Sequence, residues 1–201
     1  LLLKRQLKKN QLNIPIKKVH SIKDIIFNNY LNILEIPLKF KNPYKINKKE
    51  NSKYILKSIN LAHKLALNKE INGFINCPVD KDILFGSKNI GMTEYLAKKN
   101  KLKNSEVMMI YNKNLAVVPL TTHIPIKSVS KKLNANLIQK KIVSLNKNYY
   151  KLFKKKPLIA ILGLNPHNSE FRKNSEEKKI IIPSIKKLRK MKCKVIGPIS
   201  S

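Results

Sequence analysis

The sequence is poor in glycine and cysteine, and each shortage excludes a class of protein. Its five glycines fall in no G-x-G-x-x-G or G-x-x-x-x-G-K pattern, so the standard dinucleotide and phosphate-binding loops are absent. Two cysteines among 201 residues cannot form a disulfide scaffold. We therefore expect both cysteines to be reduced and partly buried, as in a cytoplasmic protein.

Acidic residues and arginine are also scarce. Asp and Glu together number 11 against 43 Lys and Arg, which gives a net charge of +32 and raises the possibility of nucleic-acid binding. Only Arg5, Arg172 and Arg189 are arginine, the side chain that best reads bases and grips phosphate. No aromatic cluster alternates with the lysines as stacking would require. The pattern favours a solvated lysine surface that attracts small anionic substrates, with no nucleic-acid partner.

Long apolar runs are missing. A membrane span needs about 18 consecutive apolar residues, and the longest uncharged stretches, 114–126 and 157–169, contain Pro and His. We expect no membrane partner. The opening Leu1-Leu2-Leu3 is too short for a signal-peptide core. Because the chain begins at Leu1 and ends in Pro198-Ile199-Ser200-Ser201, we expect a fragment truncated at both ends.

Hydrophobic residues make up 42% of the chain, enough for a buried core. Their spacing predicts strands that alternate with long helices, which is typical of an α/β sheet covered by helices. Helices are predicted over 51–69, 93–99, 128–155 and 176–191, the last kinked at Pro183. Strands are predicted over 14–19, 36–40, 71–76, 107–111, 115–120, 158–162 and 193–196, with 107–120 forming a hairpin and 81–91 irregular.

Two of the four histidines are candidates for chemistry. His123 and His167 each follow a predicted buried strand, and ligands bind at that edge of an α/β sheet. Imidazole is the commonest metal ligand, but hydrogen-bonded loop histidines would give the same pattern. No third ligand is obvious, although Glu170 is near in sequence. His20 and His63 are expected to have structural or surface roles.

Several short motifs occur together in the order and spacing of one enzyme family. The chain resembles the 4-hydroxythreonine-4-phosphate dehydrogenase family of pyridoxal 5′-phosphate biosynthesis from about residue 36 onward. The two most specific matches are T-T-H-x-P-x and G-L-N-P-H, each of which contains one candidate histidine. The matching segments are Thr121-Thr122-His123-Ile124-Pro125-Ile126, Gly163-Leu164-Asn165-Pro166-His167, Ser175-Glu176-Glu177 with Ile182-Pro183, Gly91-Met92-Thr93-Glu94, Val107-Met108-Met109 and Cys77-Pro78-Val79-Asp80-Lys81.

The resemblance implies an isocitrate and isopropylmalate dehydrogenase-like fold, in which two α/β domains enclose a cleft. Residues 1–84 would belong to the first domain and 85–201 to the second, both incomplete. It also implies a homodimer with its active site at the subunit interface. The implied reaction is NAD-dependent oxidation and decarboxylation of 4-phosphooxy-L-threonine to 3-amino-2-oxopropyl phosphate, assisted by a divalent metal such as zinc, magnesium or cobalt.

Carried over by residue, the resemblance makes His123 and His167 two of three metal ligands. The third would lie in a downstream Y-H-D-Q motif beyond Ser201. Thr93 matches a substrate-contacting threonine, and Met92 stands where many members have histidine. The NAD-binding residues are not identified.

Three departures keep rival functions open. Besides Met92, Cys77 replaces a glycine, and the glycine-rich turn after His167 is replaced by residues 168–173. A related dehydrogenase acting on 4-phosphorylated threonate or erythronate is therefore an alternative. A non-catalytic lysine-rich nucleic-acid-binding protein is the alternative of a different class, and it leaves the two histidines unexplained.

Overall fold

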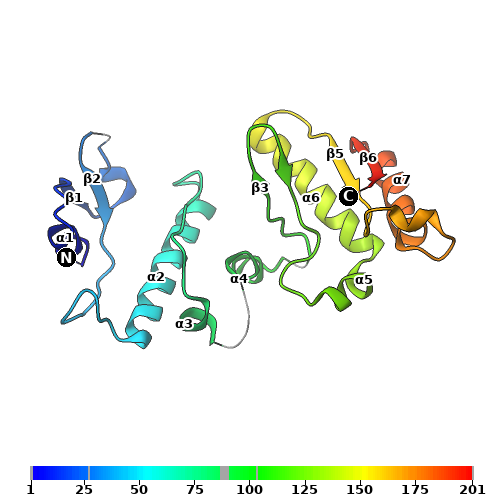
Figure 1. Ribbon diagram of the computed structural model, residues 1–201. Helices are drawn as coiled ribbons and strands as arrows, with labels where there is room; N and C mark the ends of the chain where they lie inside the picture. The colour runs from blue at the N-terminus through cyan, green and yellow to red at the C-terminus, as the bar shows by residue number, and fades with distance from the viewer. Residues whose placement is uncertain (1, 27, 87–90, 103, 201) are drawn as a thin grey trace. The chain divides into compact units, whose positions relative to one another are not determined.

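The computed structural model describes residues 2–26, 28–86, 91–102 and 104–200, and the chain forms two compact units, Leu1–Asn89 and Ile90–Ser201 (Figure 1). Each unit is described by itself. The boundary between the units lies close to the one expected at residue 84, but the assignment of 1–84 and 85–201 to two domains of a larger enzyme stays a prediction.

The first unit combines short helices with one small parallel sheet. Strands β1 (Ile16–Val19) and β2 (Leu31–Leu34) pair in parallel, with Ile16 opposite Leu31. The turn between them contains a 3₁₀ helix, η1 (Ile22–Asp24), that Ser21 and Asp24 close as a reciprocal capping box. The helices of this unit are α1 (Leu2–Lys9), α2 (Lys48–Leu67) and α3 (Lys81–Phe85).

Several expectations for the first unit are wrong. The segments 36–40 and 71–76 form no strand, and Ile75 is fully exposed, because a short apolar run needs a paired and covered neighbour to be stable as a strand. Helix α2 begins at Lys48, since the Asn47 side chain accepts the Lys49 N–H over 2.9 Å. Residues 81–85 are helical because Asp80 caps α3.

The second unit contains the remaining elements. It begins with α4 (Met92–Lys99) and a hairpin of β3 (Ile110–Tyr111) and β4 (Ala116–Val117). The elements that follow in chain order are η3 (Ile126–Ser128), α5 (Val129–Lys132), α6 (Ala135–Phe153), β5 (Ile159–Leu162), η4 (Asn168–Phe171), the π-helical turn η5 (Glu177–Ile181), α7 (Ile182–Lys190) and β6 (Val195–Ile199).

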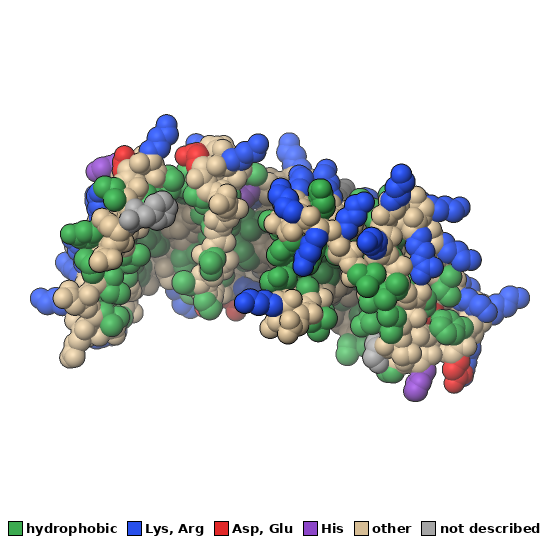
Figure 2. All heavy atoms as spheres, turned by 90° about the horizontal axis from the view of Figure 1, so that it is seen from above, with side chains coloured by type: hydrophobic (Ala, Val, Ile, Leu, Met, Phe, Trp, Pro, Cys, Tyr) green, Lys and Arg blue, Asp and Glu red, His purple; other side chains and the backbone are tan. Residues whose placement is uncertain are grey.

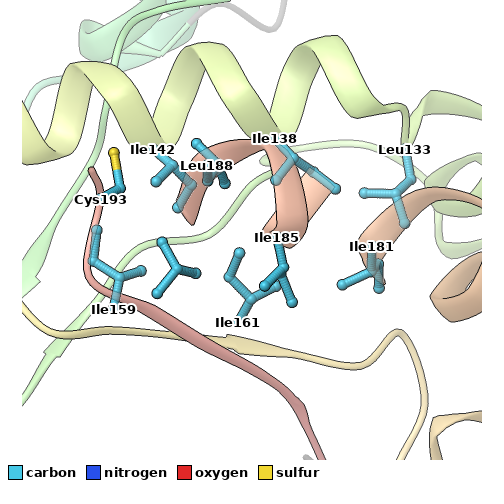
Figure 3. Close-up of a cluster of buried hydrophobic side chains, with 10 residues drawn as sticks. Leu133, Ile138, Ile142, Ile159, Ile161, Ile181, Ile185, Leu188 and Cys193 are labelled. Carbon is cyan, nitrogen blue, oxygen red and sulfur yellow. The ribbon is translucent and has the colours of Figure 1, made fainter. Parts of the chain in front are cut away.

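The core of the second unit lies between a two-stranded parallel sheet and two helices. Strands β5 and β6 pair with Ile159 opposite Val195, and alternate residues of β5 are buried. Helices α6 and α7 supply the facing side chains (Figure 3). Complete burial of one Leu or Ile contributes about 1.5–3 kcal/mol, so this cluster is the main source of stability in the unit. Its members are Leu133, Ile138, Ile142, Ile159, Ile161, Ile181, Ile185, Leu188, Cys193 and Val195.

Most expectations for the second unit are confirmed, with local differences. The hairpin forms, but each strand has two residues and is exposed. The long helix over 128–155 is broken because Asn134 is extended and caps α6 through the Leu137 N–H. Pro183 lies in the first turn of α7, directly after the π turn, where its missing N–H is not needed.

The surface carries many lysines. Figure 2 shows Lys and Arg side chains scattered over the visible face, with few acidic side chains among them. In the part of the chain that the structure describes, no helix is both long and apolar enough to span a membrane.

Candidate active site

The two candidate histidines lie on separate loops of the second unit. Strand β4, which precedes His123, belongs to the exposed antiparallel hairpin, whereas β5, which precedes His167, belongs to the parallel sheet. The expectation that both histidines follow buried strands of one α/β sheet is therefore wrong. Both imidazoles are exposed and so are accessible to a ligand.

The turn that presents His123 is fastened to the start of α4. The Thr122 hydroxyl donates a hydrogen bond to Glu94 Oε1 over 3.1 Å. A Cβ on Gly91 would collide with the Glu94 carboxylate and would lie 3.8 Å from His123 Nε2. Glycine at position 91 therefore lets a carboxylate and an imidazole converge over the helix start. His123 itself has a φ of +55°, a conformation that costs about 1–2 kcal/mol in an L residue.

The two predicted substrate-contacting residues lie at the same place. Met92 and Thr93 are the first two residues of α4 and are half-buried. Gly91, whose α-carbon His123 approaches, directly precedes them. The residue at the N-cap is Gly91, which has no side chain to cap the helix. The fold thus places His123 beside Gly91, the residue that precedes Met92 and Thr93.

The loop that presents His167 is organised by Asn165. Its Oδ1 accepts the backbone N–H of His167 over 3.1 Å and that of Ser169 over 2.9 Å, an arrangement for which Asn is suited. At the start of the loop, the Gly163 N–H donates to the Ile199 carbonyl over 2.9 Å. A Cβ on Gly163 would collide with the buried Asn168 side chain.

A buried carboxylate lies beneath this loop. Glu177 is 0% exposed, and its Oε1 accepts the Leu164 N–H over 2.9 Å. Burial is the largest single influence and raises the pKa of this carboxyl, but hydrogen bonds, the strongest from the N–H groups of Glu177 and Leu164, together outweigh burial and hold the pKa below its usual value. The Ser169 and Ser175 hydroxyls also lower it, although Oε2 has no hydrogen-bond partner of good geometry among the described residues.

The segment after His167 has an unusual backbone. Residues 168–171 are Asn, Ser, Glu and Phe, and all four have φ between +50° and +53°. Such values suit glycine, and each costs an L residue about 1–2 kcal/mol. This is where the resemblance leads one to expect glycines, so the turn keeps a left-handed backbone without the residue type that adopts it freely.

The other candidates from the sequence do not join a site. Within the described residues, no three His, Cys, Asp or Glu side chains come together as metal ligands. Glu170 is exposed and pairs with Arg172 over 2.8 Å. His63 is half-buried on α2, and His20 is exposed in the turn that Asp24 caps.

Sequence reasoning missed the supporting residues of the site. Glu94 and Glu177 are each one member of a matched motif to which the sequence assigns no role. Membership of a matched motif was the one signal that each carboxylate gave, and it does not identify a contact. Their partners, Thr122 and Leu164, are 28 and 13 residues away, distances at which spacing says nothing about contact.

Comparisons with known proteins identify the family that the sequence motifs predict. The family model described as "Pyridoxal phosphate biosynthetic protein PdxA" matches residues 2–201. The chain belongs to this family. A 4-hydroxythreonine-4-phosphate dehydrogenase from Wigglesworthia glossinidia brevipalpis is 41% identical over 155 residues, which are 75% of this chain and 46% of that protein. One from Aquifex aeolicus is 35% identical over 175 residues, or 84% and 52% of the two chains.

Solved structures confirm the mixed α/β fold. A 4-hydroxythreonine-4-phosphate dehydrogenase from Klebsiella pneumoniae has a TM-score of 0.86 at 24% identity, and the match covers 98% of this chain and 63% of that one. One from Burkholderia phymatum has a TM-score of 0.81 at 25% identity, with coverage of 98% and 62%. The chain spans about half the length of the curated PdxA relatives it matches.

Proposed function

We propose that this chain is part of an enzyme that oxidises and decarboxylates 4-phosphooxy-L-threonine, with NAD as oxidant, to give 3-amino-2-oxopropyl phosphate. Family membership supports an enzyme of pyridoxal phosphate biosynthesis. The observation that carries the proposal is the position of His123 beside Gly91, directly before Met92 and Thr93 at the start of α4. It favours the enzyme over the alternative of a lysine-rich nucleic-acid-binding protein, which gives no reason for this arrangement.

The histidines would hold a divalent cation. Two exposed imidazoles suit zinc or cobalt as donors, but the described residues supply no third ligand. The remaining ligand must come from elsewhere, and the downstream Y-H-D-Q motif is the source that we propose, in a homodimer with its active site at the subunit interface. When bound, the cation would act as a Lewis acid toward the substrate hydroxyl oxygen, and NAD would accept the hydride.

The chain's own residues would bind and orient the substrate. Thr93 would hydrogen-bond a phosphate or carboxylate oxygen of the substrate at the start of α4. His123 and His167 would hold the reacting end. The surrounding lysines raise the local concentration of a phosphorylated substrate. Two unpaired cysteines, Cys77 and Cys193, support a cytoplasmic location.

Met92 favours one alternative substrate. Where many members of the family carry histidine, this chain has a thioether that neither donates a strong hydrogen bond nor carries charge. A substrate without the amino group, 4-phosphorylated threonate or erythronate, would lose less from this change. Met92→His should then shift the ratio of kcat/KM toward 4-phosphooxy-L-threonine.

Steady-state assays of the full-length protein test the proposal. NADH formation is followed with 4-phosphooxy-L-threonine and with 4-phosphothreonate, with zinc, magnesium or cobalt added separately. His123→Ala and His167→Ala should each lower kcat by at least about 100-fold, while the matched control His20→Ala should be unchanged. Turnover that survives both histidine replacements would contradict the proposal, and a clear preference for the threonate would select the alternative substrate.

A further inference from the structure

Glu177 is a buried charge that the proposed chemistry leaves unused. Its side chain is completely enclosed, and no Lys or Arg forms an ion pair with it within the described residues. An unpaired buried carboxylate is costly unless hydrogen bonds compensate. An apolar residue of similar size would fill the same space without that cost, so packing does not account for a carboxylate here.

The compensation comes from the His167 loop. The Leu164 N–H donates to Glu177 Oε1 over 2.9 Å, and Leu164 is the second residue after β5. The preceding Gly163 N–H is bonded to Ile199 of β6. Two successive N–H groups are thus fixed, one by the sheet and one by Glu177, just before Asn165 turns the chain toward His167. The carboxylate therefore holds the peptide at which the loop leaves the sheet.

We propose that Glu177 is the positioning residue of the His167 loop, and that its carboxylate holds the Leu164 peptide so that Asn165 can present the imidazole. The effect on turnover rests on the proposed function, in which His167 binds the reacting end. The hydrogen bond between Leu164 and Glu177 does not depend on the proposed function. Glu177 lies in the π turn before α7. Ile181 of that turn and Ile185 and Leu188 of α7 belong to the core, so the contact ties the loop to the packed core of the unit.

The direct test is hydrogen exchange at the Leu164 amide of the full-length protein, measured by NMR. Glu177→Leu removes the acceptor, and exchange at Leu164 should rise by about tenfold, the equivalent of about 1.4 kcal/mol. Glu177→Gln keeps a weaker acceptor, so exchange at Leu164 should rise by a smaller factor. If Glu177→Leu does not fold, the exchange measured in Glu177→Gln is the test of the proposal. Glu176→Gln is the matched control, because that neighbouring carboxylate is only half-buried, and it should change nothing.

Turnover then separates positioning from stability. With thermal unfolding unchanged, Glu177→Gln should lower kcat by about threefold or more, whereas Glu176→Gln should not. Unchanged exchange at Leu164 in both Glu177 variants overturns the proposal, and so does faster exchange with an unaltered kcat. If the wild-type protein turns over neither phosphorylated substrate, the proposed function fails, but the exchange data still decide whether Glu177 holds the loop.

Discussion

Thr122 and Glu94 are 28 residues apart in the sequence, and a 3.1 Å hydrogen bond from the Thr122 hydroxyl to the Glu94 carboxylate joins them. The bond fastens the turn that carries His123 to the helix that begins with Met92 and Thr93. Both partners are half-buried, where such a bond is stronger than at an exposed position. A single contact thus links two segments that the proposed function needs side by side.

Removing this contact should cost measurable stability. Thr122→Val keeps the shape of the side chain but leaves Glu94 without its donor, and a hydrogen bond to a charged group contributes about 1.5–3 kcal/mol. We expect the free energy of unfolding, measured by urea denaturation, to fall by about 1–2 kcal/mol. Thr121→Val is the matched control and should stay within about 0.5 kcal/mol. Equal losses in the two variants would mean that the Thr122–Glu94 bond has no special role.

The sequence predicted the second unit better than the first, and the reason is burial. The 158–162 and 193–196 runs became the buried parallel strands β5 and β6, because α6 and α7 cover the sheet. The run 71–76, Ile-Asn-Gly-Phe-Ile-Asn, is less apolar and pairs with no strand of the described chain, and Ile75 is fully exposed. A local pattern of apolar residues shows that a segment can be buried. Whether it is buried depends on the helices or strands that pack against it.

For the site, the motifs identified the loops but not their geometry. His123 lies beside Gly91, two residues before Thr93, although the hairpin before His123 is not part of the sheet that leads to His167. The supporting carboxylates Glu94 and Glu177 could not be predicted, because their partners are far away in the chain and a carboxylate at a helix start has several local uses. Long-range hydrogen bonds carry no periodic signal.

The left-handed segment after His167 predicts a stabilising substitution. Glu170 has φ +50° and ψ +26°, and its side chain makes only an exposed ion pair with Arg172, a kind of contact that is worth little. Glu170→Gly should therefore relieve strain and raise the free energy of unfolding by about 1 kcal/mol.

Glu176 supplies the control for that substitution. It has ordinary right-handed helical angles, φ −60° and ψ −32°, so Glu176→Gly should lower stability by about 0.5–1 kcal/mol. Thermal or urea unfolding of the two variants compares the same Glu→Gly change at a left-handed and at a right-handed backbone position. Destabilisation of similar size in both would show that the segment at Glu170 is not strained in solution.

The two cysteines should differ sharply in reactivity. Cys77 is exposed, whereas Cys193 is buried in the core and burial raises the pKa of its thiol, with a smaller opposing effect from Lys156. Only the thiolate reacts readily. At pH 8 a thiol reagent should therefore modify Cys77 rapidly and Cys193 only after unfolding, as mass spectrometry of the labelled peptides would reveal. Rapid labelling of Cys193 in the folded protein would show that the segment before β6 is not buried in solution.

Glu177 should make the stability of the protein depend on pH on the acidic side. Its folded pKa lies below the usual value, so in acid the unfolded chain binds the proton more readily than the folded one. The stabilisation is fully present above the unfolded pKa of about 4.3 and is lost as the pH falls through the lower folded pKa. In Glu177→Gln this group does not titrate.

The free energies of unfolding of the wild-type protein and of Glu177→Gln should therefore converge in acid. Urea unfolding at pH 7 should give the wild-type protein the larger free energy of unfolding, and the difference from Glu177→Gln should shrink steadily as the pH falls below about 5. Glu176→Gln, measured in parallel, should show no such convergence. A difference that stays constant or grows in acid would mean that the hydrogen bonds from Leu164 and Glu177 do not outweigh burial, and that the carboxyl is protonated in the folded protein.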